Sequence, residues 1–502
     1  MNRRRFIKYA GATAAVVGAS MFGLDYLLKH PPGTQTATTA GVHQPPTIRN
    51  IRWAPSRVVN GKVYDGSISF EAEGTNSPVV GAELTFGPIY PQELSMQAFT
   101  PEPSRSFALS SHAMSADFSQ TIQNLIGGKQ YRAQVTVKDQ YGAQNQASLD
   151  IPYVRELESI LHLTKLDVSA SYMPWDFASN LQAWKREIPL MGAYDSEDDN
   201  VKMKHIDWAN GHGIAAFFVD GGEWAGHPQR APSVLTAFLR AGMRAAIQVS
   251  GDPWGGGEEN GGGYVSGTRA NAPRFTVDLS YQRNHDAFIT MVKRWLDEGF
   301  FTYSSYYKIN SRPIIFIYNA KALIDETQTF KEMRGLIRDN VGADPFIIGE
   351  LTCRIPTLPA DSEAWYFDMK DLRAYDAMTS WAGMHNQSLQ QRDQIYSTNY
   401  EHYYEIGLRA WRDFAHGRGL KFIPPVIAGF DNSYSWGPTG FPVVRDPALF
   451  EKRMRIASKY VDDDLKQIRI DTWNDFGEWT YIEPSSTTGF EFVDLLKKTL
   501  IA

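Results

Sequence analysis

Residues 201–220 read VKMKHIDWANGHGIAAFFVD, a stretch that combines one helical pattern with one strand pattern. Met203, Ile206 and Trp208 recur at helical spacing, which predicts a helix over Val201–Gly211. The run Ala215–Asp220 is apolar and rich in β-forming residues, so it predicts a buried strand. This helix-to-strand unit is repeated along the C-terminal two thirds of the chain.

Seven further apolar, β-rich runs lie beyond residue 160: Leu166–Tyr172, Ala245–Ser250, Ile314–Tyr318, Phe346–Glu350, Ala377–Ser380, Phe422–Ala428 and Gln467–Trp473. Further helical patterns cover His285–Glu298, Tyr403–Ala415 and Leu449–Val461. Alternation of strands with helices indicates a parallel α/β sheet. Eight repeats over residues 160–502 predict a (β/α)8 TIM barrel with long loops.

A doubly wound open sheet is the alternative, because it has the same alternation. Its nucleotide-binding form carries a Gly-rich phosphate loop after the first strand, and no such loop follows Tyr172. The loop DPWGGGEENGGGY over residues 252–264 is rich in glycine but lacks the Lys and Ser/Thr of a phosphate-binding loop. The sequence therefore favours the barrel.

Residues 47–155 have a different pattern, with short alternating segments and no helical period. Tyr131, Ala133, Val135 and Val137 share one face of such a segment, which predicts a small all-β sandwich domain. The string LIGGKQY, ending at Tyr131, is similar to the turn and corner tyrosine of fibronectin type III and Ig-like domains. That resemblance implies a spacer or a sugar-binding accessory.

The N-terminus contains an export pattern. Arg3-Arg4-Arg5-Phe6-Ile7-Lys8 resembles the twin-arginine signal, and a weakly apolar stretch follows, so residues 1–30 are predicted to be a signal or an anchor. Residues 31–46 are predicted to be a linker. The protein is then expected outside the cytoplasmic membrane, in the periplasm, the medium or at the cell surface. An uncleaved segment would attach it to the membrane, and an ordinary secretory signal is the alternative.

Composition narrows the class of partner. The 502 residues carry a net charge of −6 without long runs of one sign, which argues against a nucleic-acid binder. The 13 Trp, 24 Tyr and 27 Phe often stand beside Gly, Asn or Asp in predicted loops, where their rings could stack on sugars or extend the core. The single cysteine, Cys353, allows no intrachain disulfide.

Catalytic groups of such barrels lie at the C-terminal ends of the strands. Acidic, amide or aromatic residues follow all eight runs: Tyr172 and Trp175, Asp220, Trp254, Tyr318 and Asn319, Glu350, Trp381, Asp431 and Asn432, and finally Trp473, Asp475 and Glu478. A purely structural barrel would have a more ordinary rim. The predicted partner is a polysaccharide or oligosaccharide.

Asp475 and Glu478 are the predicted catalytic pair. Cleavage of a glycosidic bond requires one carboxylic acid to protonate the leaving oxygen and one carboxylate to assist attack at the anomeric carbon. A turn at Gly477 would bring both groups to one cleft. The alternative is that either residue caps a helix or forms a loop salt bridge. This chemistry requires no metal or organic cofactor, and no His pair has metal-ligand spacing near a Glu.

Several segments resemble glycoside hydrolase family 99 and family-99-like proteins. They are LMGAYD over residues 190–195, GIAAFFVD over 213–220, YYKINSRPIIFIYN over 306–319, GFDN over 429–432, and TWNDFGEWTYIEP over 472–484. The resemblance covers most of residues 165–500. It implies a barrel hydrolase of α-linked glycans, α-mannan or α-glucan, with an endo mode of action.

By position, the resemblance implies that Glu478 is the general acid/base and Asp475 its partner carboxylate. Family 99 has Glu where this chain has Asp475, and the form TWNDFGEW is also similar to family 71 α-1,3-glucanases. Retention and inversion both stay open. The resemblance further implies that six strand-end residues shape sugar subsites: Tyr172, Trp175, Asp220, Tyr318, Glu350 and Asp431. Six more residues near the strand ends are predicted to bind substrate: Trp254, Asn319, Trp381, Asn432, Trp473 and Glu483. A non-catalytic glycan-binding envelope protein and a transglycosylase are the alternatives.

Overall fold

The computed structural model describes two folded parts of the chain. It covers residues 44–59, 63–88, 104–126, 131–151, 159–175, 187–192, 194–221, 230–251, 264–265, 268, 276–352, 372–381, 399–433 and 442–501. The predicted signal, most of the predicted linker, Trp254 and Cys353 lie outside these residues. None of the helices described has the length and apolar character that a membrane span requires.

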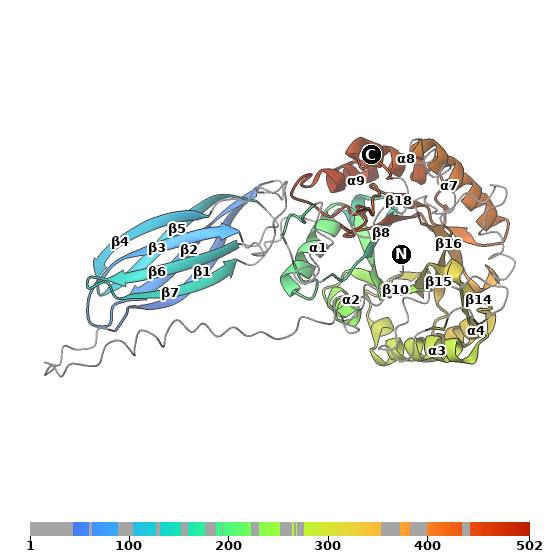
Figure 1. Ribbon diagram of the computed structural model, residues 1–502, viewed down its shortest axis with the longest axis horizontal. Coiled ribbons are helices and arrows are strands. Elements are labelled where there is room, and N and C mark those ends of the chain that lie inside the picture. Colours follow the sequence, from blue (N-terminus) through green and yellow to red (C-terminus); the bar gives the residue numbers. More distant parts are fainter. Residues whose placement is uncertain are drawn as a thin grey trace, which may run out of the picture.

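The N-terminal part is all-β, as predicted (Figure 1). Its strands are β1 (Thr47–Val59), β2 (Val63–Glu73), β3 (Val79–Pro88), β4 (Arg105–Ala113), β5 (Ser115–Ile126), β6 (Tyr131–Asp139) and β7 (Gln144–Ile151). They form two antiparallel sheets in the orders β1-β2-β5 and β4-β3-β6-β7. Alternate residues of β6, beginning with Tyr131, are buried, which builds one core. Its fibronectin type III character stays a prediction.

The C-terminal part contains a curled parallel sheet surrounded by helices (Figure 1). Its strands are β8 (Asp167–Tyr172), β9 (Ile214–Asp220), β10 (Arg244–Ser250), β13 (Arg312–Tyr318), β15 (Phe346–Thr352), β16 (Ala377–Ser380), β17 (Lys421–Phe422), β18 (Pro425–Ile427) and β19 (Gln467–Asp471). Three short strands flank them, β11 (Val277–Asp278), β12 (Lys308–Ile309) and β14 (Leu323–Ile324). The predicted barrel-like α/β fold is confirmed at this level.

The seventh predicted strand, Phe422–Ala428, is broken into two halves. Pro424 and Pro425 have no N–H to donate, so β17 and β18 are separate short strands. β17 pairs with β16 and β18 pairs with β19, which makes the two halves the opposite ends of one hydrogen-bonded path. The N–H of Ile423 donates to Met378 (3.0 Å) and the N–H of Arg469 donates to Pro424 (3.1 Å). The ladder therefore runs round a ring.

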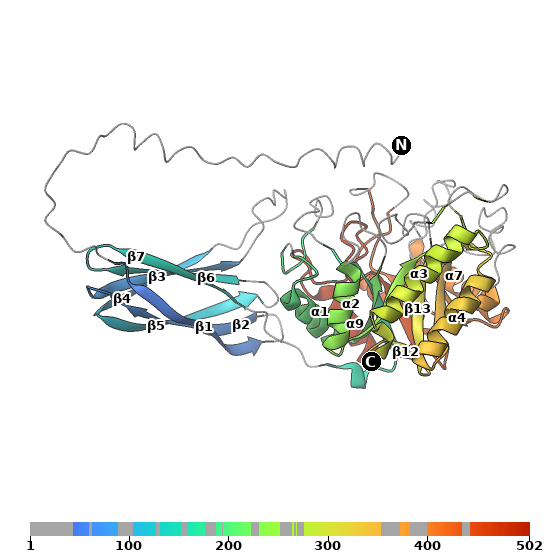
Figure 2. The same ribbon diagram turned by 90° about the horizontal axis from the view of Figure 1, so that it is seen from below.

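Helices cover the outside of this ring, as Figure 2 shows from the side. They are α1 (Asp199–Gly211), α2 (Arg230–Arg240), α3 (Gln282–Asp297), α4 (Thr327–Val341), α7 (Tyr400–His416), α8 (Pro447–Ser458) and α9 (Glu491–Ile501). In α1 the Asp198 side chain caps the first turn by accepting from the N–H of Asn200. Ile206 and Trp208 are buried, but Met203 is 53% exposed, so the predicted helix is confirmed and part of its predicted apolar face is wrong.

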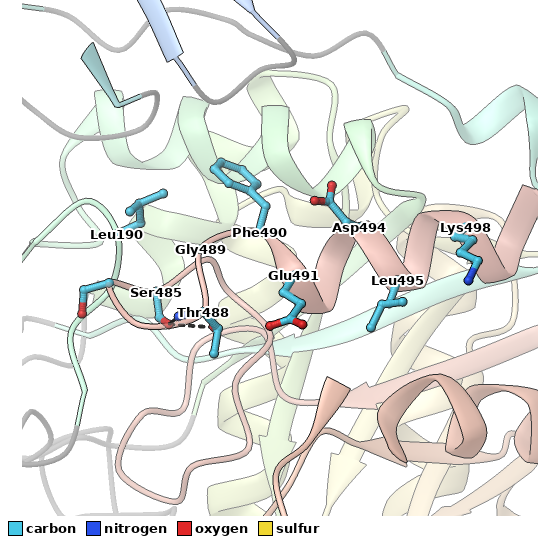
Figure 3. Close-up of a pocket in the computed structure, with 10 residues that line it drawn as sticks. Leu190, Ser485, Thr488, Gly489, Phe490, Glu491, Asp494, Leu495 and Lys498 are labelled. Atoms are coloured by element: carbon cyan, nitrogen blue, oxygen red, sulfur yellow. Dashed lines mark hydrogen bonds between the residues drawn. The ribbon is translucent and has the colours of Figure 1, made fainter. Parts of the chain in front are cut away.

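A groove of about 720 Å³ opens beside the first turns of α9 (Figure 3). Its lining combines apolar side chains with charged ones: Leu190, Ser485, Ser486, Thr488, Gly489, Phe490, Glu491, Asp494, Leu495 and Lys498. Neither Asp475 nor Glu478 lines it. The groove is therefore separate from the predicted chemistry.

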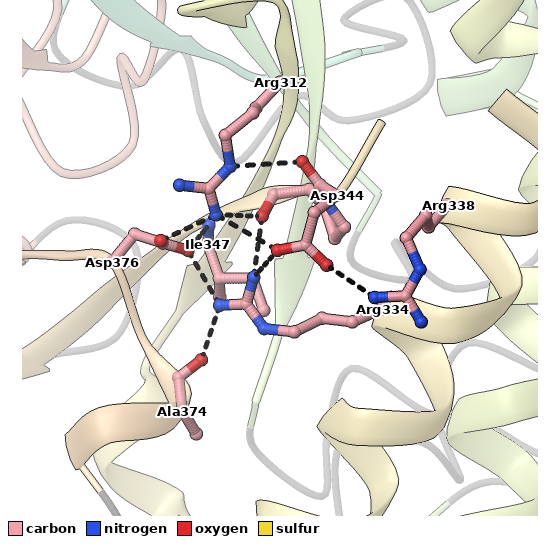
Figure 4. Close-up of polar contacts among 8 residues, drawn as sticks. Arg312, Arg334, Arg338, Asp344, Ile347, Ala374 and Asp376 are labelled. Atoms are coloured by element: carbon pink, nitrogen blue, oxygen red, sulfur yellow. Dashed lines mark hydrogen bonds and ion pairs between the residues drawn. The ribbon is translucent and has the colours of Figure 1, made fainter. Parts of the chain in front are cut away.

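Strands β13, β15 and β16 are joined at their N-terminal ends by a charge cluster (Figure 4). Asp376 accepts from Arg312 (2.6 Å) and from Arg334 of α4 (2.7 Å), and also from the backbone N–H of Ile347 (2.9 Å). Asp344 also accepts from both guanidinium groups, from Nη2 of Arg312 at 3.3 Å and from Nη1 of Arg334 at 2.6 Å. One carboxylate therefore links two strands and a helix.

Replacing Asp376 with Ala is expected to lower the free energy of unfolding by about 2–4 kcal/mol, because two guanidinium groups lose one of their two carboxylate acceptors and the N–H of Ile347 loses its acceptor. Urea unfolding measures this loss. Asp339→Ala is the matched control, since Asp339 is 77% exposed and lies 3.9 Å from Arg338, and an exposed pair contributes less than about 1 kcal/mol. Equal losses in the two variants would contradict a stabilising cluster.

Candidate active site

The loop after β19 folds back onto the end of its own strand. The N–H of Thr472 donates to the carbonyl of Thr480 (3.2 Å), and the two threonine hydroxyls lie 3.0 Å apart. The N–H of Ile482 returns to the carbonyl of Thr472 (3.2 Å). This closed loop holds Asp475 and Glu478 at the C-terminal end of the last barrel strand, where barrel enzymes carry their catalytic groups.

Asp475 organises the turn that carries both carboxylates. Its N–H donates to the hydroxyl of Thr472 (2.9 Å), and its Oδ1 accepts the N–H of Glu478 (2.9 Å). Asp475 thus caps the turn rather than a helix, and this contact fixes its side chain beside the backbone of Glu478. Asp475 is buried, whereas Glu478 is partly exposed.

The two carboxyl groups influence each other electrostatically. Burial raises the pKa of Asp475 to about 6, the N–H groups of Glu478 and Gly477 oppose the rise, and the charge of Asp220 adds to it. Burial also raises the pKa of Glu478 well above its usual value, and the charges of Asp475 and Asp471 raise it further. The first group to ionise then keeps the second protonated, which is the arrangement of one base and one acid.

Glu478→Gln is expected to stabilise the protein more at pH 8 than at pH 4. The pKa of Glu478 is raised in the folded state, so its stabilising contribution is present below about 4.5 and is lost as the pH rises through the folded pKa. Gln carries no charge to bury. Urea unfolding at both pH values, with the exposed Glu491→Gln as control, measures the effect. A difference that does not change with pH would contradict it.

Neighbouring strand ends meet this turn. Asp220 of β9 is close enough to Asp475 for its charge to act there. The N–H of Asp431 donates to the carbonyl of Glu478 (2.9 Å), and Oδ1 of Asp431 accepts from Ser433 (3.0 Å). Residues predicted from the ends of the second, seventh and eighth strands are thus brought together, with buried Asn432 adjacent.

Aromatic side chains stand at the C-terminal ends of three other strands, β13, β16 and β18. The rings of Tyr318 and Trp381 meet edge to face at 6.4 Å, and Trp381 meets Phe430 in the same way at 6.3 Å. Tyr318 and Trp381 are partly exposed. Glu350 is buried beneath them and accepts the N–H groups of Asn319 (2.7 Å) and Trp381 (3.1 Å). Glu350 therefore holds the strand ends that present the rings.

Tyr172 and Trp473 lie between the sheet and the helices rather than over the ring. Successive side chains of a strand point to opposite faces. Ser171 contacts Arg469 inside the ring (3.3 Å), so Tyr172 faces outward, where its hydroxyl lies 3.0 Å from His205 of α1. Trp473 also packs against His205, with ring centroids 5.6 Å apart. Tyr172 and Trp473 were predicted to line sugar subsites, but both side chains pack against α1 on the outside of the sheet.

Trp175 and Glu483 are buried and form hydrogen bonds with the loop that follows β19. The indole N–H of Trp175 donates to the carbonyl of Asn474 (2.9 Å). Glu483 is 1% exposed and accepts from the hydroxyl of Tyr194 (2.7 Å). This buried position does not fit the prediction that Glu483 contacts sugar.

The sequence reasoning missed two residues of this region. Asn474 is fully buried and joins the loop to the end of β8. Arg469 is buried inside the ring, where it pairs with Asp471 and donates to the carbonyl of Ser380 (2.9 Å). The alternation of Gln467, Arg469 and Asp471 in the last strand was the available signal, because every second residue shares a face. Among the described residues, no three His, Cys, Asp or Glu groups gather as a metal ion requires.

The chain is similar to one protein family in sequence and to several solved proteins in structure. The sequence profile of a family described as "Glycosyltransferase WbsX" matches residues 277–496, short of half the chain. A solved "Glycoside hydrolase-like protein" is 18% identical, with a TM-score of 0.52, over 70% of this chain and 96% of the other. A family 99 endo-α-mannosidase of Bacteroides thetaiotaomicron, in two structures, is 15% identical over 67% of this chain and 96% of its own, with TM-scores of 0.43 and 0.42. None of the curated proteins matches significantly.

At 18% identity, the structural likeness establishes the fold alone. The matched segment runs from β11 to α9 and includes the turn with Asp475 and Glu478. Residues 277–496 therefore carry the sequence pattern of the WbsX family, within a barrel that has the fold of a glycoside hydrolase-like protein.

Proposed function

We propose that this protein is a glycoside hydrolase that cleaves α-linked glycans of the α-mannan or α-glucan type, with an endo mode. The observation that carries the proposal is the pair Asp475 and Glu478 on one turn at the C-terminal end of β19, with both pKa values raised. A pair with separated pKa values supplies the acid and the base that glycosidic cleavage needs.

In this proposal Glu478 is the general acid. Its raised pKa favours the protonated form that a general acid requires, and its partial exposure allows it to reach the leaving oxygen. Asp475, with a pKa of about 6, is the carboxylate that assists attack at the anomeric carbon. The backbone N–H groups of Gly477 and Glu478 orient it.

The partly exposed rings of Tyr318 and Trp381 are proposed to bind sugar by stacking, with Asp220, Asp431 and Asn432 as polar partners. Trp254 is proposed for the same surface from the sequence alone. Aromatic faces suit sugar rings because they are apolar and flat while their edges are polar.

Glycosyl transfer is the second candidate, and the description of the matched family favours it. The same two carboxylates would then deliver the sugar to an acceptor hydroxyl instead of water. In such a transglycosylation the donor is the same α-linked glycan, its glycosidic bond breaks, and the departing glycan hydroxyl takes the proton of Glu478, as in hydrolysis. The two reactions then differ only in the acceptor.

Incubation of the purified protein with a panel of α-linked polysaccharides, followed by product analysis, tests the proposal. Hydrolysis gives shorter oligosaccharides with new reducing ends. Transfer gives longer products that depend on an added acceptor glycan. Binding without any product would contradict both enzymatic readings and support a glycan-binding protein.

We further propose export by the twin-arginine route through residues 1–30, and a spacer role for the β domain as a fibronectin type III-like unit. Replacing the arginine run Arg3–Arg5 with lysines is expected to retain the protein in the cytoplasm. Fractionation of cells that express each form checks this expectation, and unchanged export would contradict the route.

A further inference from the structure

A chain of buried polar side chains runs behind the turn that carries Asp475 and Glu478. It begins at Asn474, passes through Tyr194 and Glu483, and ends at His205 of α1. All four side chains are at most 4% exposed. Buried polar groups are costly unless each is paired, so such a chain constrains the loop to which it is attached.

The Asn474 amide fixes the direction of these hydrogen bonds. Its Oδ1 accepts the N–H of Met173 (2.8 Å), and its Nδ2 donates to the Met173 carbonyl (2.9 Å) and to the hydroxyl of Tyr194 (3.1 Å). Because Tyr194 accepts from Asn474, its own proton is free to go to Oε2 of Glu483 (2.7 Å). Glu483 is therefore the acceptor that orients the hydroxyl of Tyr194, and this hydroxyl adds to the hold of the Met173 backbone on Asn474.

Glu483 is also tied to the same loop through its backbone. Its N–H donates to the carbonyl of Trp473 (2.8 Å), and its Oε1 lies 3.2 Å from Nε2 of His205. Both ends of the carboxylate-bearing loop are thus hydrogen-bonded to each other and to the end of β8, and Glu483 also lies against His205 of α1. None of these contacts reaches solvent, which excludes a direct role in holding sugar.

We propose that Glu483 and Tyr194 are positioning residues that hold Asn474, and with it the Asp475–Glu478 turn, in the geometry for catalysis. The inference rests on the proposed function where it treats the turn as catalytic. Whether Glu483 and Tyr194 hold the loop in place can be tested without measuring turnover. Displacement of a reacting group by about 1 Å can slow a reaction by roughly a hundredfold, so this support matters for rate.

Amide hydrogen exchange on the full chain tests whether Tyr194 helps to hold the Asp475–Glu478 turn in place. Tyr194→Phe removes one buried hydroxyl and is expected to speed exchange of the Glu478 N–H by about tenfold, as loss of one buried hydrogen bond allows. Tyr306→Phe is the matched control, because Tyr306 is equally buried and its hydroxyl donates to Ile314 (2.9 Å) away from the loop. Equal exchange of Glu478 in the two variants would overturn the inference.

The effect of Glu483 on the reaction rate is tested by comparing the kinetics of two replacements. Glu483→Leu deprives Tyr194 of its acceptor and is expected to lower kcat by about a hundredfold with KM changed less than about threefold. Glu483→Gln keeps an oxygen that accepts from Tyr194, so it should recover most of that loss and keep wild-type exchange at Glu478. A Gln variant as slow as Leu would overturn positioning. Wild-type protein without turnover on any glycan would instead contradict the proposed function.

Discussion

Glu478→Gln is expected to lower the rate of glycan cleavage by about a thousandfold, within the range that a general acid contributes. Gln cannot protonate the departing oxygen, yet it has the same size and retains a polar group for binding. Kd for an α-linked oligosaccharide should therefore change less than about threefold. Initial rates from reducing-end release and Kd from calorimetry measure the two quantities.

The control for this variant is Glu491→Gln, which removes an exposed carboxylate from the first turn of α9. It should leave both the rate and Kd unchanged. Wild-type turnover by Glu478→Gln would remove Glu478 from the role of acid. Parallel loss of binding and rate would point to a role in holding sugar.

Asp475→Asn is expected to lower kcat by about a hundredfold or more and to change the pH profile of the residual activity. In the wild type, kcat/KM should fall at low pH as Asp475, with a pKa of about 6, becomes protonated. It should fall at high pH as Glu478 loses its proton. Because the charge of Asp475 raises the pKa of Glu478, its removal should move the alkaline limb to lower pH.

Asp463→Asn serves as the control for this prediction, since Asp463 is exposed on the loop before β19. Its pH profile should coincide with that of the wild type. An alkaline limb that stays in place in Asp475→Asn would show that the two carboxyl groups do not share an electrostatic environment.

The barrel-like fold was predictable from sequence because its strands are buried on both faces and appear as apolar runs such as Ala215–Asp220. Pro424 and Pro425 split the seventh run, and the loss of two N–H donors was readable in the sequence as well. Met203 was wrongly assigned to the apolar face, because it stands five residues before Trp208 and so lies about 140° from it around the helix.

The carboxylate pair was predictable because both residues follow one strand within a few positions. The placement of Tyr172 was less so, since one step along a strand exchanges the inner face for the outer one. The support from Asn474, Tyr194 and Glu483 joins residues far apart in the chain. Only the fold brings these partners together, so the sequence alone suggested that Glu483 contacts substrate.

If Asp475 and Glu478 act together on one glycosidic bond at the end of the last strand, a bound glycan must lie against both of them. A crystal structure of Glu478→Gln with an uncleaved α-linked oligosaccharide shows where the glycan lies. We expect the glycosidic oxygen within hydrogen-bond distance of residue 478, and the anomeric carbon or its 2-hydroxyl beside Asp475. A sugar chain bound elsewhere, or a residue 478 side chain turned away from it, would rule out joint action of the two carboxyl groups.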